Sequence, residues 1–120
     1  MRATGSGNRL MKFAVRIQRR ARQDYEAILS YIAKRSPEGA SAWARAFDRA
    51  LERLEDFADT FPPAIENELV EFEVREILFK TRRGLVYRAL FTTADNTVQI
   101  LHVRGPGQDL LSIEELIQPL

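Results

Sequence analysis

The hydrophobic period of the chain changes twice, and this succession limits the possible folds more than any single motif does. Phe13, Val15 and Ile17 alternate with polar residues, which is typical of a strand. From Arg19 the apolar residues recur three or four positions apart, which predicts two helical segments with the stripes Ala21, Tyr25, Ile28, Leu29, Ile32 and Trp43, Phe47, Ala50, Leu51, Leu54, Phe57. After residue 71, short runs of β-branched and aromatic residues predict strands again.

The two helical segments are separated by Ser36-Pro37. Serine is a preferred N-cap residue, and proline fits the first helical position because its missing N–H would have no partner there. We therefore expect the first helix to end near Arg35 and the second to begin at once. Such a short connection favours an antiparallel helical hairpin. Phe61-Pro62-Pro63 should stop the second helix.

Three further strands are predicted at 72–80, 85–92 and 97–104, separated by turns at 81–84 and 93–96. They should form an antiparallel meander, which the first strand joins at an edge or in the interior. Gly105-Pro106-Gly107 should end the last strand, and Ser112-Ile113-Glu114-Glu115 indicates a short C-terminal helical turn. The fold class is thus α+β, in the order β-α-α-β-β-β, with the helical hairpin packed on an antiparallel sheet.

The length of 120 residues, with 45% hydrophobic and 29% charged residues, favours one globular domain. We place this domain at residues 11–120. Residues 1–10 contain Gly5, Ser6 and Gly7 and show no apolar periodicity. We expect them to be a disordered extension, either native or left over from cloning.

Composition also excludes several kinds of protein. The net charge of +1 argues against a general nucleic-acid binder. The absence of cysteine and the presence of only one histidine argue against a disulfide scaffold and a metal site, so we expect no metal or other cofactor. No apolar run is long enough to span a bilayer or to act as a secretory signal. We therefore expect a cytoplasmic protein without a membrane partner.

Charge is distributed unevenly along the second half of the chain. Residues 60–76 hold five glutamates and one arginine, a local charge of −4, whereas residues 77–104 hold five cations and one aspartate, a local charge of +4. Two interpretations are open. In the first, Arg82 and Arg83 are solvated turn residues and the strand charges protect the sheet from edge pairing, as is common; in the second, the cations bind a target. In the second case the binding residues are Lys80, Arg82, Arg83, Arg88 and Arg104.

Arg88 and the end of the last strand are the most specific of these features. A mid-strand arginine must point at solvent or at a partner, since β propensity favours other residues there. Strict alternation would put Val98, Ile100, His102 and Arg104 on one side of the last strand, next to the glycine-rich loop. An imidazole and a guanidinium at such a corner could bind a phosphate. A lone strand histidine is, however, more often a structural hydrogen-bonding residue.

Several segments, in this order, resemble the RelE/ParE superfamily of type II toxins: the first strand, Asp24-Tyr25-Glu26-Ala27-Ile28 to Tyr31-Ile32, Ser36-Pro37, Val74-Arg75-Glu76-Ile77, Tyr87-Arg88-Ala89-Leu90-Phe91 and Val98-Gln99-Ile100-Leu101-His102-Val103-Arg104. The resemblance covers about Phe13 to Asp109. It implies a helical hairpin on a sheet, and a small toxin neutralised by an antitoxin encoded beside it.

The superfamily has two branches with different targets. RelE-like members cut mRNA on the ribosome, and the resemblance would then make Arg88, His102 and Arg104 catalytic. However, only Arg75 stands near the lysine pair of that branch, and its C-terminal tyrosine is absent. ParE-like members inhibit DNA gyrase and have no known catalytic site.

The long, closely joined helices favour a ParE-like toxin. The histidine that typically follows the last strand in ParE is replaced by Gly105. Whether the chain is an enzyme stays open at this point, with the non-enzymatic toxin favoured. A homologue that has lost its toxicity is the remaining alternative.

Overall fold

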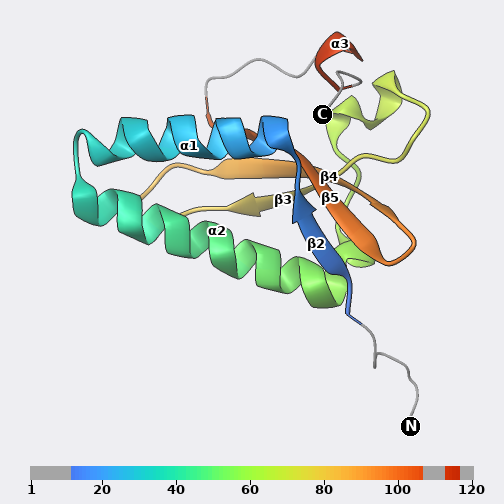
Figure 1. The fold of residues 1–120 in the computed structure, drawn as a ribbon, viewed down its shortest axis with the longest axis horizontal. Helices are drawn as coiled ribbons and strands as arrows, with labels where there is room; N and C mark the ends of the chain where they lie inside the picture. The colour runs from blue at the N-terminus through green and yellow to red at the C-terminus, as the bar shows by residue number, and fades with distance from the viewer. Residues whose placement is uncertain (1–11, 107–112, 117–120) are drawn as a thin grey trace, which may run out of the picture.

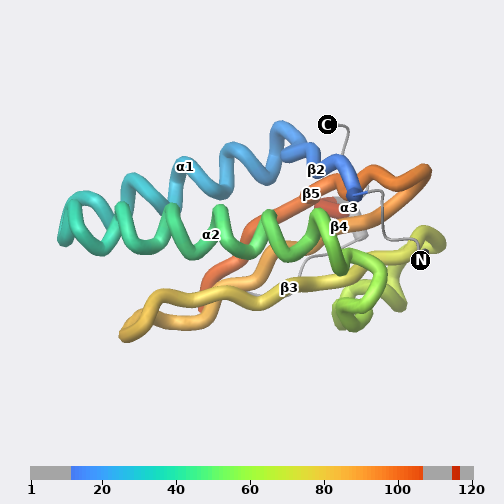
Figure 2. Tube along the Cα trace, turned by 90° about the horizontal axis from the view of Figure 1, so that it is seen from below, coloured from blue at the N-terminus to red at the C-terminus, as the bar shows by residue number. Residues whose placement is uncertain are grey.

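The computed structural model describes residues 12–106 and 113–116 of the chain. The domain has two layers, a pair of long helices and a four-stranded sheet (Figures 1 and 2). The elements follow in the order β2 (Ala14–Ile17), α1 (Arg19–Ala33), α2 (Pro37–Phe57), η1 (Ala58–Thr60), η2 (Ile65–Leu69), β3 (Arg75–Phe79), β4 (Tyr87–Ala94), β5 (Thr97–Arg104) and α3 (Ile113–Leu116). The predicted element order is confirmed. The prediction for residues 1–10 lies outside the described residues.

The connection between α1 and α2 is the one predicted. Ser36 has an extended backbone, and its Oγ accepts a hydrogen bond of 2.9 Å from the N–H of Gly39. Pro37 occupies the first turn of α2. The apolar stripe of α2 is buried at Trp43, Phe47 and Leu54, among others. Phe57 is an exception at 54% exposure, because α2 ends there and gives way to η1.

The sheet is mixed, so the expectation of a purely antiparallel sheet is wrong. β3, β4 and β5 form the predicted antiparallel meander, but β2 pairs in parallel with β5, giving the order β2-β5-β4-β3. The helical hairpin explains the direction. It returns the chain to the start of β2, where the N–H of Phe13 donates to the carbonyl of Glu55 at 2.8 Å. β3 therefore starts at the same end as β2, and β5, two strands later, runs the same way.

The ends of β3 and β4 differ from the predicted ones by a few residues. β3 begins at Arg75 rather than residue 72, and β4 runs from Tyr87 to Ala94 rather than from 85 to 92. The β4–β5 connection is reduced to a tight turn with Asp95 and Asn96 at φ 53° and 61°. Positive φ at both central residues is typical of a type I′ hairpin turn. Asp and Asn adopt a positive φ more readily than most residues do.

A β-bulge interrupts the pairing of β4 with β5. Leu90 pairs with His102 and Phe91 with Ile100, so Leu101 is the extra residue on β5. The prediction that Val98, Ile100, His102 and Arg104 share one side is therefore wrong. Val98 and Ile100 belong to the helix-facing core with Val103, and the bulge leaves His102 and Arg104 on the opposite face.

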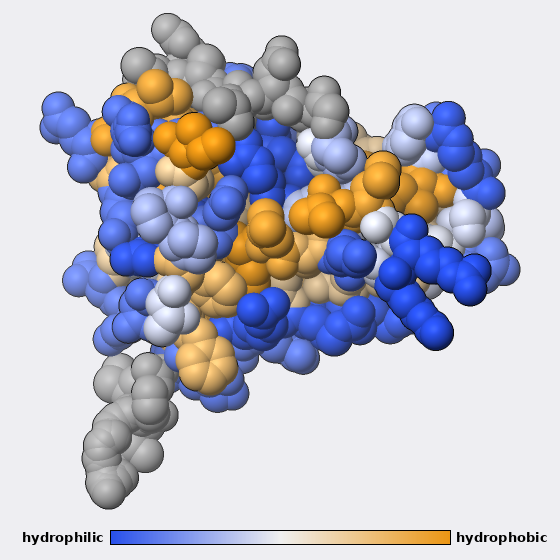
Figure 3. Space-filling model, turned by 180° about the vertical axis from the view of Figure 1, so that it is seen from behind, coloured by the Kyte–Doolittle hydropathy of each residue, from blue (hydrophilic) through white to orange (hydrophobic). Residues whose placement is uncertain are grey.

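The main core is an aromatic cluster between the helices and the sheet. Trp43 lies at its centre, 5.2 Å from Tyr25, 5.4 Å from Tyr87 and 5.7 Å from Phe79 between ring centroids. A smaller cluster of Ala64, Val74, Leu90 and Leu116 covers part of the other face of the sheet. Figure 3 shows apolar surface remaining on the side of the molecule that is hidden in Figure 1. Three large apolar residues of β3 and the β3–β4 connection are exposed: Leu78 to 53%, Leu85 to 65% and Val86 to 46% of their surface.

Candidate functional site

Arg88 is held inside the protein by two glutamates. Its Nη1 and Nη2 donate to the two carboxylate oxygens of Glu66 at 2.9 and 2.5 Å, and Nη1 also donates to Glu76 Oε1 at 3.2 Å. The Arg88 side chain is 18% exposed and that of Glu66 is fully buried. The hydrogen bond that Arg88 donates to Glu66 raises the pKa of Arg88, despite burial, which alone would lower it.

This contact fixes the acidic segment on the sheet. η2, which carries Glu66, lies against the back of β4, and the side chain of Asn67 accepts a 2.8 Å hydrogen bond from the N–H of Val74. The bidentate geometry is the strongest form of an arginine–carboxylate pair. The mid-strand arginine thus has a partner in the same chain, which the sequence analysis had not identified.

His102 is also enclosed. Its side chain is 2% exposed, and Nε2 lies 3.1 Å from the carbonyl oxygen of Glu115. Because a carbonyl oxygen can only accept, Nε2 carries the proton in this contact. Nδ1 lies 3.5 Å from Asp24 Oδ2, too far for a strong hydrogen bond. The geometry matches the structural interpretation of His102 rather than an imidazole presented to a phosphate.

Asp24 joins α1 to this end of β5. Its carboxylate accepts hydrogen bonds from the backbone N–H of Val103 at 3.0 Å and from Arg20 Nε at 3.1 Å. Burial raises the pKa of Asp24, but the contact with His102 and the bonds from Val103 and Arg20 outweigh it, so the pKa lies below the usual value. A partly buried carboxylate with these donors stabilises the packing of α1 on the sheet.

Arg104 is 8% exposed and pairs across the sheet with Arg88. The structure therefore brings Arg88, His102 and Arg104 to one region, as the sequence analysis expected. It encloses all three side chains, with Arg88 in contact with Glu66 and His102 in contact with the carbonyl of Glu115.

The other predicted cations lie just beyond the same end of the sheet, where β3 leads into β4. Lys80, Arg82 and Arg83 are exposed on the connection between β3 and β4. This connection closes with a hydrogen bond of 3.2 Å from the N–H of Gly84 to the carbonyl of Thr81. A Cβ at Gly84 would lie 2.1 Å from Thr81 Oγ1, so glycine allows this tight approach.

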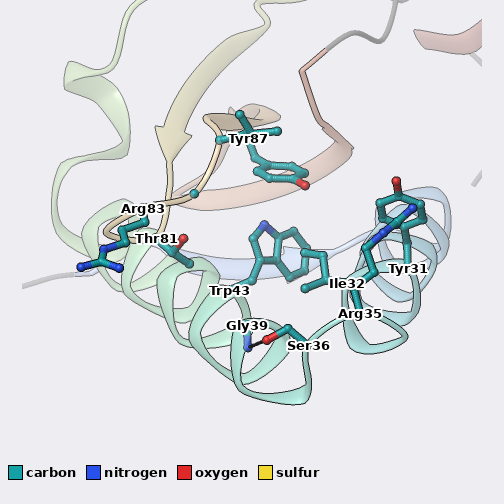
Figure 4. A pocket seen from close by; sticks show the side chains of 11 residues that line it. Tyr31, Ile32, Arg35, Ser36, Gly39, Trp43, Thr81, Arg83 and Tyr87 are labelled. Carbon is teal, nitrogen blue, oxygen red and sulfur yellow. Dashed lines mark hydrogen bonds between the residues drawn. The ribbon is translucent and has the colours of Figure 1, made fainter.

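A cavity of about 380 Å³ opens beside this connection. It is lined by side chains of the α1–α2 corner and of the connection: Tyr31, Ile32, Arg35, Ser36, Gly39, Trp43, Thr81, Arg83, Gly84, Leu85 and Tyr87. Figure 4 shows Trp43 between Arg83 on one side and Tyr31 with Arg35 on the other. The guanidinium of Arg35 stacks on the Tyr31 ring, 4.2 Å from its centroid.

The cavity combines an aromatic wall with a cationic rim. Arg35 and Arg83 line it, and no acidic side chain of the described residues does. The Nε1 of Trp43 is buried without a hydrogen-bond partner among the described residues. From its place on the apolar stripe, Trp43 was expected only to be a buried residue of the core. The Tyr31–Arg35 spacing of four positions on a helix was the available signal for this rim.

The described residues contain no cluster of metal-ligating side chains. Within the same residues, no helix is long and apolar enough to cross a membrane.

A family model described as "ParE toxin of type II toxin-antitoxin system, parDE" matches residues 15–110. The chain belongs to the ParE toxin family. The ParE-like branch favoured in the sequence analysis is therefore confirmed, and the chain is a type II toxin by family. The match includes both helices, all of β3, β4 and β5, and the basic connection at 80–84.

A solved structure gives the ParE fold independently. A chain of the "Chromosomal ParDE TA system from P. aeruginosa" superposes with a TM-score of 0.59 at 21% sequence identity. The alignment covers 82% of this chain and 98% of that one. No curated protein sequence matches the chain.

Proposed function

We propose that this ParE family member inhibits growth by binding a macromolecular target, DNA gyrase in the first instance, and that a cognate antitoxin neutralises it. The family match supports a toxin, and the P. aeruginosa structure with a similar fold comes from a ParDE toxin–antitoxin system. The observation that carries the choice of mechanism is the enclosure of His102 and Arg88. A metal-free ribonuclease needs a base, an acid and cations that reach the substrate phosphate.

The surface that suits target binding is the exposed β3–β4 connection. Lys80, Arg82 and Arg83 have no carboxylate partner among the described residues, and the aromatic cavity opens beside them. Exposed cations next to an apolar cavity favour a partner that inserts an apolar side chain into the cavity and carries acidic residues around it. The charges steer association, and the inserted side chain supplies affinity. We assign Arg82 and Arg83 as target-binding residues on this ground.

Expression of the chain in a sensitive host tests the proposal. We expect growth arrest, loss of gyrase supercoiling activity in an extract, and unchanged ribosome-bound mRNA. Arg82→Glu/Arg83→Glu should relieve the arrest, because reversing two exposed charges opposes an acidic partner. Arg22→Glu changes one exposed charge on α1, away from the connection, and serves as the control.

His102→Ala separates the two mechanisms. Removing a general acid or base costs a nuclease roughly 100-fold or more in rate, whereas a binding toxin has no proton-transfer step. We expect His102→Ala to stay toxic if circular dichroism shows that it folds. Cleaved mRNA with the wild-type chain, abolished in the folded variant, would establish a RelE-like ribonuclease instead.

A further inference from the structure

β3 is the edge strand of the sheet, and only half of its outer edge is covered. The N–H of Glu76 donates to the carbonyl of Pro62 at 3.1 Å, and the N–H of Ala64 donates to the carbonyl of Val74 at 2.9 Å. These bonds show that the even-numbered residues point their backbone groups away from β4. Hydrogen-bonded and non-bonded pairs alternate in an antiparallel ladder, so the N–H and C=O of Leu78 must also point outward.

The chain segment at 62–64 ends its pairing before it reaches Leu78. No backbone partner from another element contacts the outward groups of Leu78 within the described part of the chain. An uncovered edge of this kind is a template for another strand. In Figure 2, β3 lies at the border of the sheet, next to α2.

A groove of about 330 Å³ runs between this free edge and α2. Leu78, Phe79 and Lys80 form one wall, and Ala46, Arg49, Ala50 and Arg53 form the other. The small side chains of Ala46 and Ala50 leave room beside the strand. The groove therefore lies where an added strand would have to pass.

The charges of the groove have one sign. Arg49 and Arg53 are four positions apart, on one face of α2, and Lys80 lines the groove just after the end of β3. No acidic residue of the described chain lines the groove. Cations on both sides of a free strand edge suit a peptide that is extended and acidic.

We propose that this groove binds an extended acidic segment of a partner protein, which continues the sheet by pairing with β3 from Leu78 to Lys80. Backbone hydrogen bonds to the edge would give affinity, and carboxylates meeting Arg49 and Arg53 would give specificity. The inference rests on the proposed function insofar as it takes the partner to be the antitoxin. It identifies a surface distinct from the aromatic cavity at the β3–β4 connection.

The test is an NMR titration of the ¹⁵N-labelled full chain, made by cell-free synthesis, with the peptide acetyl-(Glu-Val)₄-amide. We expect shifts of the amide signals of Leu78, Phe79 and Lys80, and slower hydrogen exchange at the Leu78 N–H. Arg49→Glu/Arg53→Glu should weaken binding roughly tenfold, the effect of reversing two exposed charges. Arg19→Glu/Arg22→Glu reverses two exposed charges on α1, is the matched control and should bind as the wild type does.

Two modified peptides isolate the two parts of the proposal. Acetyl-(Lys-Val)₄-amide should not bind, because its charge has the wrong sign. An acidic peptide N-methylated at alternate residues keeps its charge but cannot pair as a strand, so it should also fail to bind. Equal binding of the N-methylated peptide, or shifts confined to other elements, would overturn the proposal.

An oligothymidylate added to the same sample tests for nucleic acid. If the oligothymidylate shifts the amide signals of Leu78 and Lys80 and the acidic peptide does not, the groove binds nucleic acid, and the proposal is overturned. The titration does not depend on toxicity. A chain that binds the peptide without arresting growth would refute the proposed function and leave this inference standing.

Discussion

Replacing Glu66 by leucine should destabilise the protein through Arg88. Leucine fills a similar volume, so the main change is the loss of a fully buried carboxylate that holds both terminal nitrogens of the guanidinium. Breaking a buried pair on one side typically costs about 3 to 5 kcal/mol. Arg88 keeps Glu76 and is 18% exposed, so we expect a loss near the lower figure.

Urea unfolding followed by circular dichroism measures this loss as a shift of the midpoint at constant m-value. For a domain of this size, about 3 kcal/mol corresponds to a fall of roughly 10 °C in the melting temperature. Arg88→Met should cost a similar amount, because it leaves the Glu66 carboxylate buried without its guanidinium.

The double variant Glu66→Leu/Arg88→Met decides the reasoning. Replacing both members of a buried pair by apolar residues is often nearly neutral, so we expect most of the stability to return. This variant also lacks the predicted catalytic arginine. A double variant that loses the sum of the two single losses, or a loss for Glu66→Leu under about 1 kcal/mol, would refute the view that this pair holds the 60–74 segment on the sheet.

Two further predictions concern the core and the α1–β5 contact. Trp43 is 2% exposed, so its fluorescence should be blue-shifted in the native protein and shift to the red on unfolding, and Trp43→Ala should cost about 3 to 5 kcal/mol in a denaturant titration. The pKa of Asp24 is below 3.8 in the folded state, so its contribution to stability is full above that pH and is lost as the pH falls through the folded value. Asp24→Asn should therefore show a smaller difference in urea midpoint between pH 7 and pH 3 than the wild type, and an equal difference would contradict the assignment.

The helices were predictable because their signals are local. The Ser36 cap, Pro37 and the apolar stripes all act within a few residues, and the structure follows them. The strand 97–104 was predicted to the residue for the same reason, since a turn and a glycine bound it.

The bulge at Leu101 and the partner of Arg88 were not predictable in this way. The bulge depends on the pairing of two strands, and strict alternation cannot show an extra residue. Glu66 lies 22 positions before Arg88 in a run of acidic residues that has the composition of a solvated connection. Only the folded chain shows that two of the five glutamates, Glu66 and Glu76, reach the arginine.

The parallel pairing of β2 with β5 affects when the protein can fold during synthesis. Ala14 pairs with Thr97, 83 positions further along, and β5 separates β2 from the rest of the sheet. The nascent chain can form its helical hairpin early, because those contacts are local, but β2 has no strand to pair with until β5 has left the ribosome. The sheet is thus completed only after β5 has been translated, and any toxicity that requires the native domain begins no earlier than that.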